Sequence, residues 1–142
     1  MGGPRSNKKP TTEELDLLAV AEDLARRKEV KFLEGVHARL PMHGAVVETL
    51  GCLYTEMGRY QDGLRADRQM VGMEPHSPIA WYNLACSLSL TGQPDEAFAA
   101  LEKALSLGYN DAEWMVEDED FKSIRSDPRF ARILAQLHAR NA

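Results

Sequence analysis

A 34-residue period in the sequence predicts an all-α fold of stacked helical hairpins. Similar side chains recur at this offset within the 142 residues, as in Leu50 with Leu84, Gly51 with Ala85, Cys52 with Cys86, and Gly58 with Gly92. This period is typical of helix-turn-helix repeats. Apolar residues also recur every three or four positions between glycine and proline breaks, which is the spacing of an amphipathic helix. Stacked hairpins present an extended concave face, which favours a function in holding another molecule.

The composition excludes several classes of protein. With 44% hydrophobic and 27% charged residues, the chain has the make-up of an ordinary soluble domain. A net charge of −5 argues against nucleic acid as a partner, because phosphate binding needs a basic surface. The apolar stretch Leu15 to Ala21 contains Asp16 and is flanked by acidic residues, so it fits neither a signal sequence nor a membrane span. We therefore expect a cytoplasmic protein with no membrane partner.

The first part of the chain is expected to hold a leader and an irregular hairpin. Residues 1–10 are rich in glycine, proline and basic side chains, which predicts a flexible leader. Thr11 and Glu14 form a capping-box pattern, so a helix should begin near Thr12. The apolar periodicity changes phase after Arg26, which predicts a turn near Lys28 and a second helix that ends at Pro41.

Clearer signals divide the rest of the chain. Gly58 and Gly92 each follow an apolar helical stripe and are suited to end a helix. Ser77 followed by Pro78 is a helix-start signal, and Asp127 followed by Pro128 is another. The last helix carries a stripe of Phe130, Ile133, Leu134 and Leu137. We expect this stripe to cover the open apolar end of the stack.

One segment carries a family resemblance. The run Trp81-x2-Leu84-Ala85-x2-Leu88, followed by Ala97-x3-Leu101 and Ala104, resembles the tetratricopeptide repeat pattern. The unit from Gly44 to Ser77 fits nearly as well, although Val47 replaces the aromatic residue and Asp67 stands where an apolar residue is usual. The resemblance implies a right-handed α-solenoid of about three to four such units with a C-terminal capping helix. It divides a single domain, 11–142, into a degenerate repeat 11–43, repeats 44–77 and 78–111, and a partial repeat with cap 112–142.

The resemblance also implies a concave groove that receives a peptide or a partner helix. Transferring the usual groove positions to this sequence gives Glu48, Cys52, Thr55, Glu56, Ile79, Tyr82, Asn83, Cys86 and Ser89. This lining is mixed and slightly acidic. Repeats that clamp a C-terminal carboxylate need lysine, arginine and asparagine, and of these the predicted groove has Asn83 alone, which argues against that ligand.

No motif for catalysis, cofactor binding or metal binding is found, so we expect a protein that is not an enzyme and needs no cofactor or metal. His37 and His43 have no third ligand at a suitable spacing, and the acidic run from Glu117 to Asp120 is expected to be solvated surface. Trp81 and Trp114 lie in apolar stripes and are expected to pack in the core, whereas Tyr82 is expected to face the groove. The two cysteines are expected to be free thiols.

Three functions remain open from the sequence. The preferred one is a non-enzymatic adaptor that binds a protein segment in the groove. The second is a dedicated chaperone that masks an apolar substrate, such as a secreted or assembly-prone protein. The third is a structural unit that self-associates through Met57, Met70 or Met73. The sequence does not decide the oligomeric state.

Overall fold

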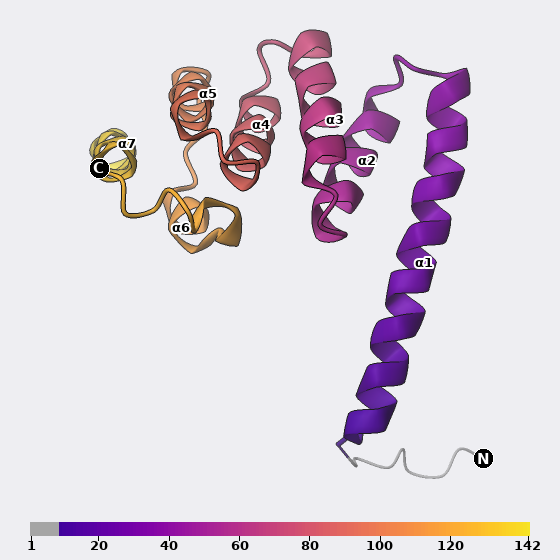
Figure 1. Ribbon diagram of the computed structural model, residues 1–142. Helices are drawn as coiled ribbons and strands as arrows, with labels where there is room; N and C mark the ends of the chain where they lie inside the picture. Colours follow the sequence, from indigo (N-terminus) through magenta and orange to yellow (C-terminus); the bar gives the residue numbers. More distant parts are fainter. Residues whose placement is uncertain (1–8) are drawn as a thin grey trace, which may run out of the picture.

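The computed structural model describes residues 9–142, and every regular element among them is a helix (Figure 1). The elements are α1 (Thr12–Arg39), α2 (Gly44–Glu56), α3 (Tyr60–Met73), α4 (Pro78–Leu90), α5 (Pro94–Ser106), α6 (Ala112–Glu117), the 3-10 turn η1 (Glu119–Phe121) and α7 (Pro128–Asn141). The predicted all-α fold is thereby confirmed. Most of the predicted flexible leader, residues 1–8, lies outside the described residues.

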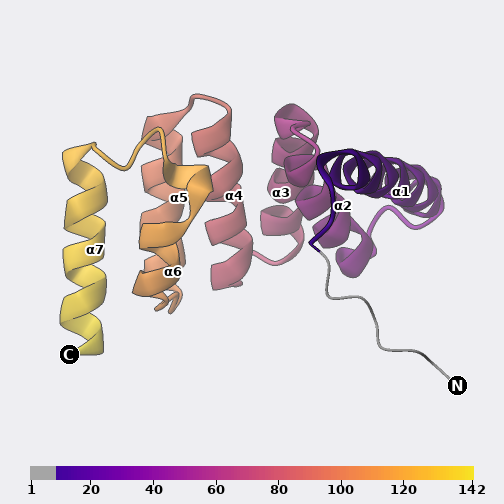
Figure 2. The ribbon, with the colours of Figure 1, turned by 90° about the horizontal axis from the view of Figure 1, so that it is seen from below.

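Successive helices stack along one direction. The pairs α2 with α3 and α4 with α5 form antiparallel hairpins, and α3 packs on α4 to join them (Figure 1). Seen from the second direction, α7 closes the C-terminal end beside α5 and α6 (Figure 2). Phe130, Ile133 and Leu137 of α7 are buried there, as the apolar stripe of this helix predicts. The arrangement is a short helical solenoid with a capping helix.

Several helix ends predicted from the sequence are formed by the expected glycine conformations and side-chain caps. Gly58 has φ of 74° and Gly92 has φ of 73°, a left-handed conformation that side-chain-bearing residues rarely adopt. The Ser77 hydroxyl accepts a hydrogen bond from the Ala80 amide, and Pro78 takes the first turn of α4. Thr11 and Glu14 form the reciprocal capping box at the start of α1. Local chemistry therefore places these ends.

The turn predicted near Lys28 is wrong. Helix α1 continues without interruption for 28 residues, through Lys28 to Arg39. The segment has no glycine or proline between Thr12 and Lys28 and is rich in alanine, leucine, arginine and glutamate, which favour helix. The change in apolar phase marks a different event, because it is the point where α1 begins to pack against α2. Val30 is the one fully buried residue of α1.

The core consists of three separate clusters. The largest joins α3, α4, α5, α6 and α7. A second joins α1 to α2 around Val30 and Leu50, and a third joins α2, α3 and α4 around Val47 and Met70. Met57 and Met73 pack against the second and third clusters. The three methionines predicted as a self-association surface are therefore engaged in internal packing.

None of the helices in residues 9–142 combines the length and the apolar character needed to cross a membrane.

Candidate partner-binding cleft

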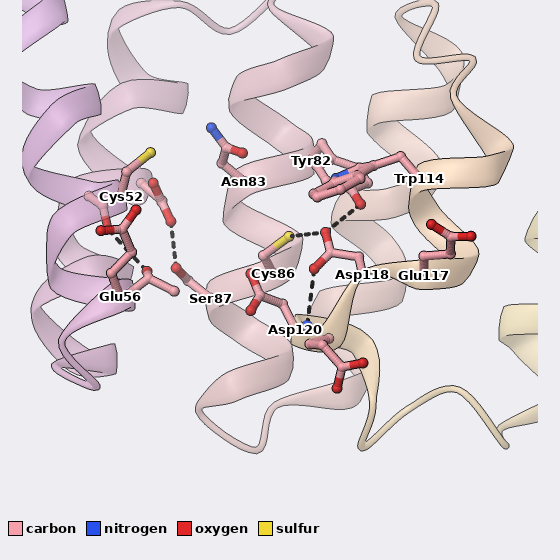
Figure 3. Close-up of a pocket in the computed structure, with 14 residues that line it drawn as sticks. Cys52, Glu56, Tyr82, Asn83, Cys86, Ser87, Trp114, Glu117, Asp118 and Asp120 are labelled. Carbon is pink, nitrogen blue, oxygen red and sulfur yellow. Dashed lines mark hydrogen bonds between the residues drawn. The ribbon is translucent and has the colours of Figure 1, made fainter. Parts of the chain in front are cut away.

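A cleft of about 500 Å³ opens where α2, α4 and α6 face the same side of the solenoid (Figure 3). We call it the acidic cleft. Its lining comprises Gly51, Cys52, Thr55, Glu56, Asp67, Tyr82, Asn83, Cys86, Ser87, Trp114, Glu117, Asp118, Glu119 and Asp120. Six of the nine groove residues predicted from the sequence are among them. The first helix of each hairpin supplies most of this lining, as a concave groove between repeats requires.

The lining carries charge of one sign. Six of its side chains are carboxylates, and among these described lining residues there is no lysine, arginine or histidine. Glu56, Glu117 and Glu119 are exposed, so their charges face solvent at the cleft. Trp114 stands beside them with 55% of its surface exposed. A negative surface with an exposed indole suits a cationic, amphipathic ligand, because the indole face attracts cations.

Asp67 forms the floor of the cleft between α3 and α4. It is buried and accepts a hydrogen bond from the Ser87 hydroxyl. Burial is the main cause that raises the pKa of Asp67 from 3.8 to about 6, and nearby Asp120 and Glu48 add to the rise, while the Ser87 hydrogen bond opposes it. Gly51 leaves room for this carboxylate, since a Cβ at that position would lie 2.9 Å from Asp67 Oδ1.

The floor continues in a hydrogen-bonded group around Asp118. The Tyr82 hydroxyl donates to Asp118 Oδ2 at 2.7 Å, and the Cys86 thiol lies 3.7 Å from the same oxygen (Figure 3). Asp118 Oδ1 accepts from the Asp120 amide at 3.0 Å. Arg125 donates through Nη2 to the Asp118 carbonyl oxygen at 2.8 Å. These bonds fix the chain after α6 across α4.

Tyr82 lies at the cleft, but the chain after α6 covers its ring. The ring is buried, stacks on Tyr109 at a centroid distance of 4.3 Å and meets Phe121 edge-on at 5.4 Å. Cys86 and Ser89 are buried by the same segment, with Ser89 Oγ 3.3 Å from Ser123 Oγ. Tyr82 and Cys86 therefore reach the cleft from its floor, and Ser89 lies beneath the chain instead of lining the cleft.

Two further expectations are corrected here. Asp118 is buried and Asp120 is half-buried, so the acidic run is not simply solvated surface. Trp114 is exposed and lies at the cleft, because Ala112 and Met115 are the residues of the six-residue α6 that face the core. Trp81, by contrast, is half-buried against the core, and its Nε1 donates to the Pro75 carbonyl oxygen.

The remaining groove residues predicted from the sequence lie at the margins of the acidic cleft. Exposed Glu48 and Ile79 line a small neighbouring hollow together with Asn83, which also belongs to the acidic cleft. Cys52, Thr55 and Glu56 lie on the α2 side, where Glu56 also pairs with Arg26 at 3.5 Å. Sequence reasoning missed Trp114, Glu117 and Glu119, since the repeat pattern was transferred to two units and not to α6.

One group in the cleft has the composition of a cation site. Cys86, Asp118 and Asp120 place ligand atoms within 4.8 Å of one another. Both Asp118 oxygens already accept hydrogen bonds within the protein, and burial raises the pKa of the Cys86 thiol well above its ordinary value. The arrangement is explained by internal hydrogen bonding, and metal independence stays a prediction.

Both thiols are free, as predicted. Partial desolvation of its thiol at the cleft, followed by the charges of Asp67 and Glu48, also raises the pKa of Cys52. The thiolate is the nucleophilic form of cysteine, and the cleft disfavours it at both positions. Neither thiol has the electropositive surroundings of an activated cysteine.

Comparisons with known proteins agree with this fold. The tetratricopeptide repeat pattern matches residues 78–111, which form the hairpin of α4 and α5. A chloroplastic protein from Arabidopsis thaliana is 30% identical over 90 residues, which cover 61% of this chain and 27% of that protein. The chain thus spans about a quarter of the length of this relative.

Solved structures of MamA share the fold. The structure described as MamA MSR-1 C2 aligns with a TM-score of 0.64 and 21% identity, covering 87% of this chain and 74% of the other. MamA 41-end from Desulfovibrio magneticus RS-1 aligns with a TM-score of 0.66 and 19% identity, covering 87% and 68%. The chain thus has a helical-repeat fold, and residues 78–111 within it match the tetratricopeptide repeat.

Proposed function

We propose that the protein is a non-enzymatic scaffold that holds a lysine- or arginine-bearing segment of a partner protein in the acidic cleft. The observation that carries the proposal is the lining itself, which combines exposed Glu117, Glu119 and Glu56 with exposed Trp114 and no basic side chain among the described lining residues. Binding in the concave face is the mode that stacked hairpins make available.

The electrostatics favour a cation on two grounds. Unpaired carboxylates at one site repel each other, and a positive ligand relieves this repulsion. The raised pKa values of Asp67 and Asp120 report that cost, which burial causes and neighbouring carboxylates increase. The apolar part of a lysine or arginine side chain can lie on the Trp114 ring while its charged end reaches Glu117.

The test uses a fluorescein-labelled peptide of alternating lysine and alanine, with an alternating glutamate and alanine peptide for comparison. We expect the lysine peptide to bind, the glutamate peptide not to bind, and added salt to weaken binding. Glu117→Lys and Trp114→Ala should each reduce affinity by about tenfold. Glu102→Lys makes the same charge change on an exposed α5 residue outside the cleft and should reduce it much less.

Equal binding of both peptides, or equal losses in Glu117→Lys and Glu102→Lys, would reject the acidic cleft as the site. If the lysine peptide binds selectively, cross-linking locates the contact. A carbodiimide couples carboxylates to amines without a spacer. Cross-links of the lysine peptide should map to Glu117 or Glu119.

The chaperone alternative differs in the chemistry of its ligand. A chaperone for an apolar substrate needs an apolar groove, whereas the polar rim of the acidic cleft favours a charged segment. Co-purification of one abundant, otherwise insoluble protein would favour the chaperone. A cytoplasmic location also stays a prediction, checked by fractionation of the native cell; the relative from Arabidopsis thaliana is described as chloroplastic.

A further inference from the structure

Helix α1 is about twice as long as the helix that it packs against. It has 28 residues and α2 has 13, so the N-terminal half of α1 extends past the body of the solenoid (Figure 1). Val30 faces α2 and is buried. Ala21 lies nine residues before Val30, which is two and a half helical turns, so the two residues point in opposite directions.

The face around Ala21 is apolar and exposed. Leu17, Leu18 and Leu24 are 65%, 55% and 52% exposed, and Phe32, on the same side further along, is 70% exposed. Ala21 and Ala25 complete the stripe, and both are exposed. We call this surface the outer face of α1. Monomeric proteins rarely leave so continuous an apolar surface in water.

The part of the outer face from Glu14 to Lys28 is nearly symmetric about Ala21. Leu18 and Leu24 lie three residues before and after it, and Leu17 and Ala25 lie four residues before and after it. At seven residues the pair is Glu14 and Lys28, which carry opposite charges. All these positions fall within the same side of the helix, because three, four and seven residues correspond to about one or two turns.

This symmetry fits a second copy of the helix running in the opposite direction. When two such helices pack with their Ala21 residues opposed, Leu18 of one copy meets Leu24 of the other. Glu14 then meets Lys28 of the other copy at both ends of the contact. Small Ala21 at the centre allows the two backbones to approach closely.

We propose that the protein forms a two-fold symmetric dimer in which the outer faces of two α1 helices pack antiparallel, centred on Ala21. The contact is isologous, so it closes at two copies and does not extend into a filament. It leaves the acidic cleft of each copy free, because none of the residues that line the cleft belongs to α1. The proposed dimer does not depend on the ligand that is proposed for the acidic cleft.

The first test is the mass of the full chain by sedimentation across a concentration series. We expect a species of twice 15.9 kDa that dissociates on dilution. Leu18→Glu and Leu24→Glu should each raise the dimer Kd by at least about tenfold, because each dimer would bury two introduced charges. Ala19→Glu is the matched control. Ala19 is exposed on the same free half of α1 and lies two residues before Ala21, which places it on the other side of the helix, so the dimer Kd of this variant should stay nearly unchanged.

A charge exchange tests the antiparallel register. Glu14→Lys and Lys28→Glu should each weaken the dimer, and the double variant should restore it. Glu14→Lys also removes the capping box, but Lys28→Glu cannot repair a cap, so restoration would report the pairing itself. Circular dichroism shows whether each variant keeps its helix content. A constant monomer mass, equal weakening by Ala19→Glu and Leu18→Glu, or no restoration in the double variant would overturn the proposal.

Discussion

Tyr82 on α4 and Asp118 after α6 are joined by a 2.7 Å hydrogen bond that crosses 36 residues of sequence. The phenol donates to a carboxylate that is itself buried, so this bond holds the chain that follows α6 against α4. Burial, and then the Asp118 hydrogen bond, raise the pKa of the Tyr82 phenol well above its ordinary value. Tyr82 therefore stays protonated and acts as a permanent donor.

Tyr82→Phe should destabilise the fold by about 1–3 kcal/mol, because the buried Asp118 carboxylate loses a donor. The matched control is Tyr109→Phe. Tyr109 stacks on Tyr82, and its own buried hydroxyl has no hydrogen-bond partner among the described residues, so its removal should be nearly neutral. Urea unfolding measures both. Equal losses in the two variants would show that ring packing and not the hydrogen bond is responsible.

Gly51→Ala should destabilise the hairpin of α2 and α3 by about 1–3 kcal/mol, since the new Cβ would lie 2.9 Å from Asp67 Oδ1. Gly35→Ala makes the same change in α1, where no atom lies within 4 Å, and should stabilise by about 0.5–1 kcal/mol through helix propensity. Thermal unfolding distinguishes the signs. Placing Gly51→Ala in an Asp67→Ala background should remove most of its destabilisation.

Asp67 should give stability a measurable pH dependence. Its pKa is about 6 in the folded protein against an ordinary 3.8, so between about pH 4 and pH 6 the folded state binds more protons than the unfolded state. The free energy of unfolding contributed by this group therefore falls as the pH rises through that window. Protonation stabilises the fold, and ionisation above pH 6 withdraws that stabilisation.

Asp67→Asn removes the ionisation and keeps an acceptor for Ser87. Relative to the unmodified protein, this variant should gain stability between pH 4 and pH 7, by up to about 3 kcal/mol. Urea unfolding of both proteins at each pH gives the difference. A difference that does not change with pH would mean that Asp67 titrates near its ordinary pKa.

The two thiols should react in sequence with Ellman's reagent. Cys52 is exposed and should react in the folded protein, more slowly than free cysteine, because its pKa is raised. Cys86 is buried and should react when the protein unfolds. Cys52→Ser should abolish the reaction of the folded protein. Two thiols reacting at one rate without denaturant would show that the segment over Cys86 opens readily.

The repeat architecture was predictable because its signals are local. Gly58 and Gly92 end helices by their own backbone conformation, and Ser77 with Pro78 starts one within a single turn. Such features depend on neighbours in sequence, so a pattern of residue types suffices to place them. The continuity of α1 was missed for the converse reason, since its apolar phase change comes from packing on α2 and not from the chain itself.

The predicted part of the cleft shows the same division. Cys52, Asn83 and Glu56 follow from their positions in the repeat, whereas the burial of Asp118 depends on a phenol far away in sequence. The sequence of an acidic run is the same whether its residues are exposed to solvent or buried beneath a tyrosine. Only the path of the chain after α6 distinguishes the two environments.

The three core clusters give the molecule uneven resistance to opening. Five helices share the largest cluster, whereas α1 packs on the body through a small cluster around Val30. Amide hydrogens of α1 should thus exchange faster than those of α4 and α5. Local opening of α1 should therefore need less free energy than opening of the hairpin of α4 and α5.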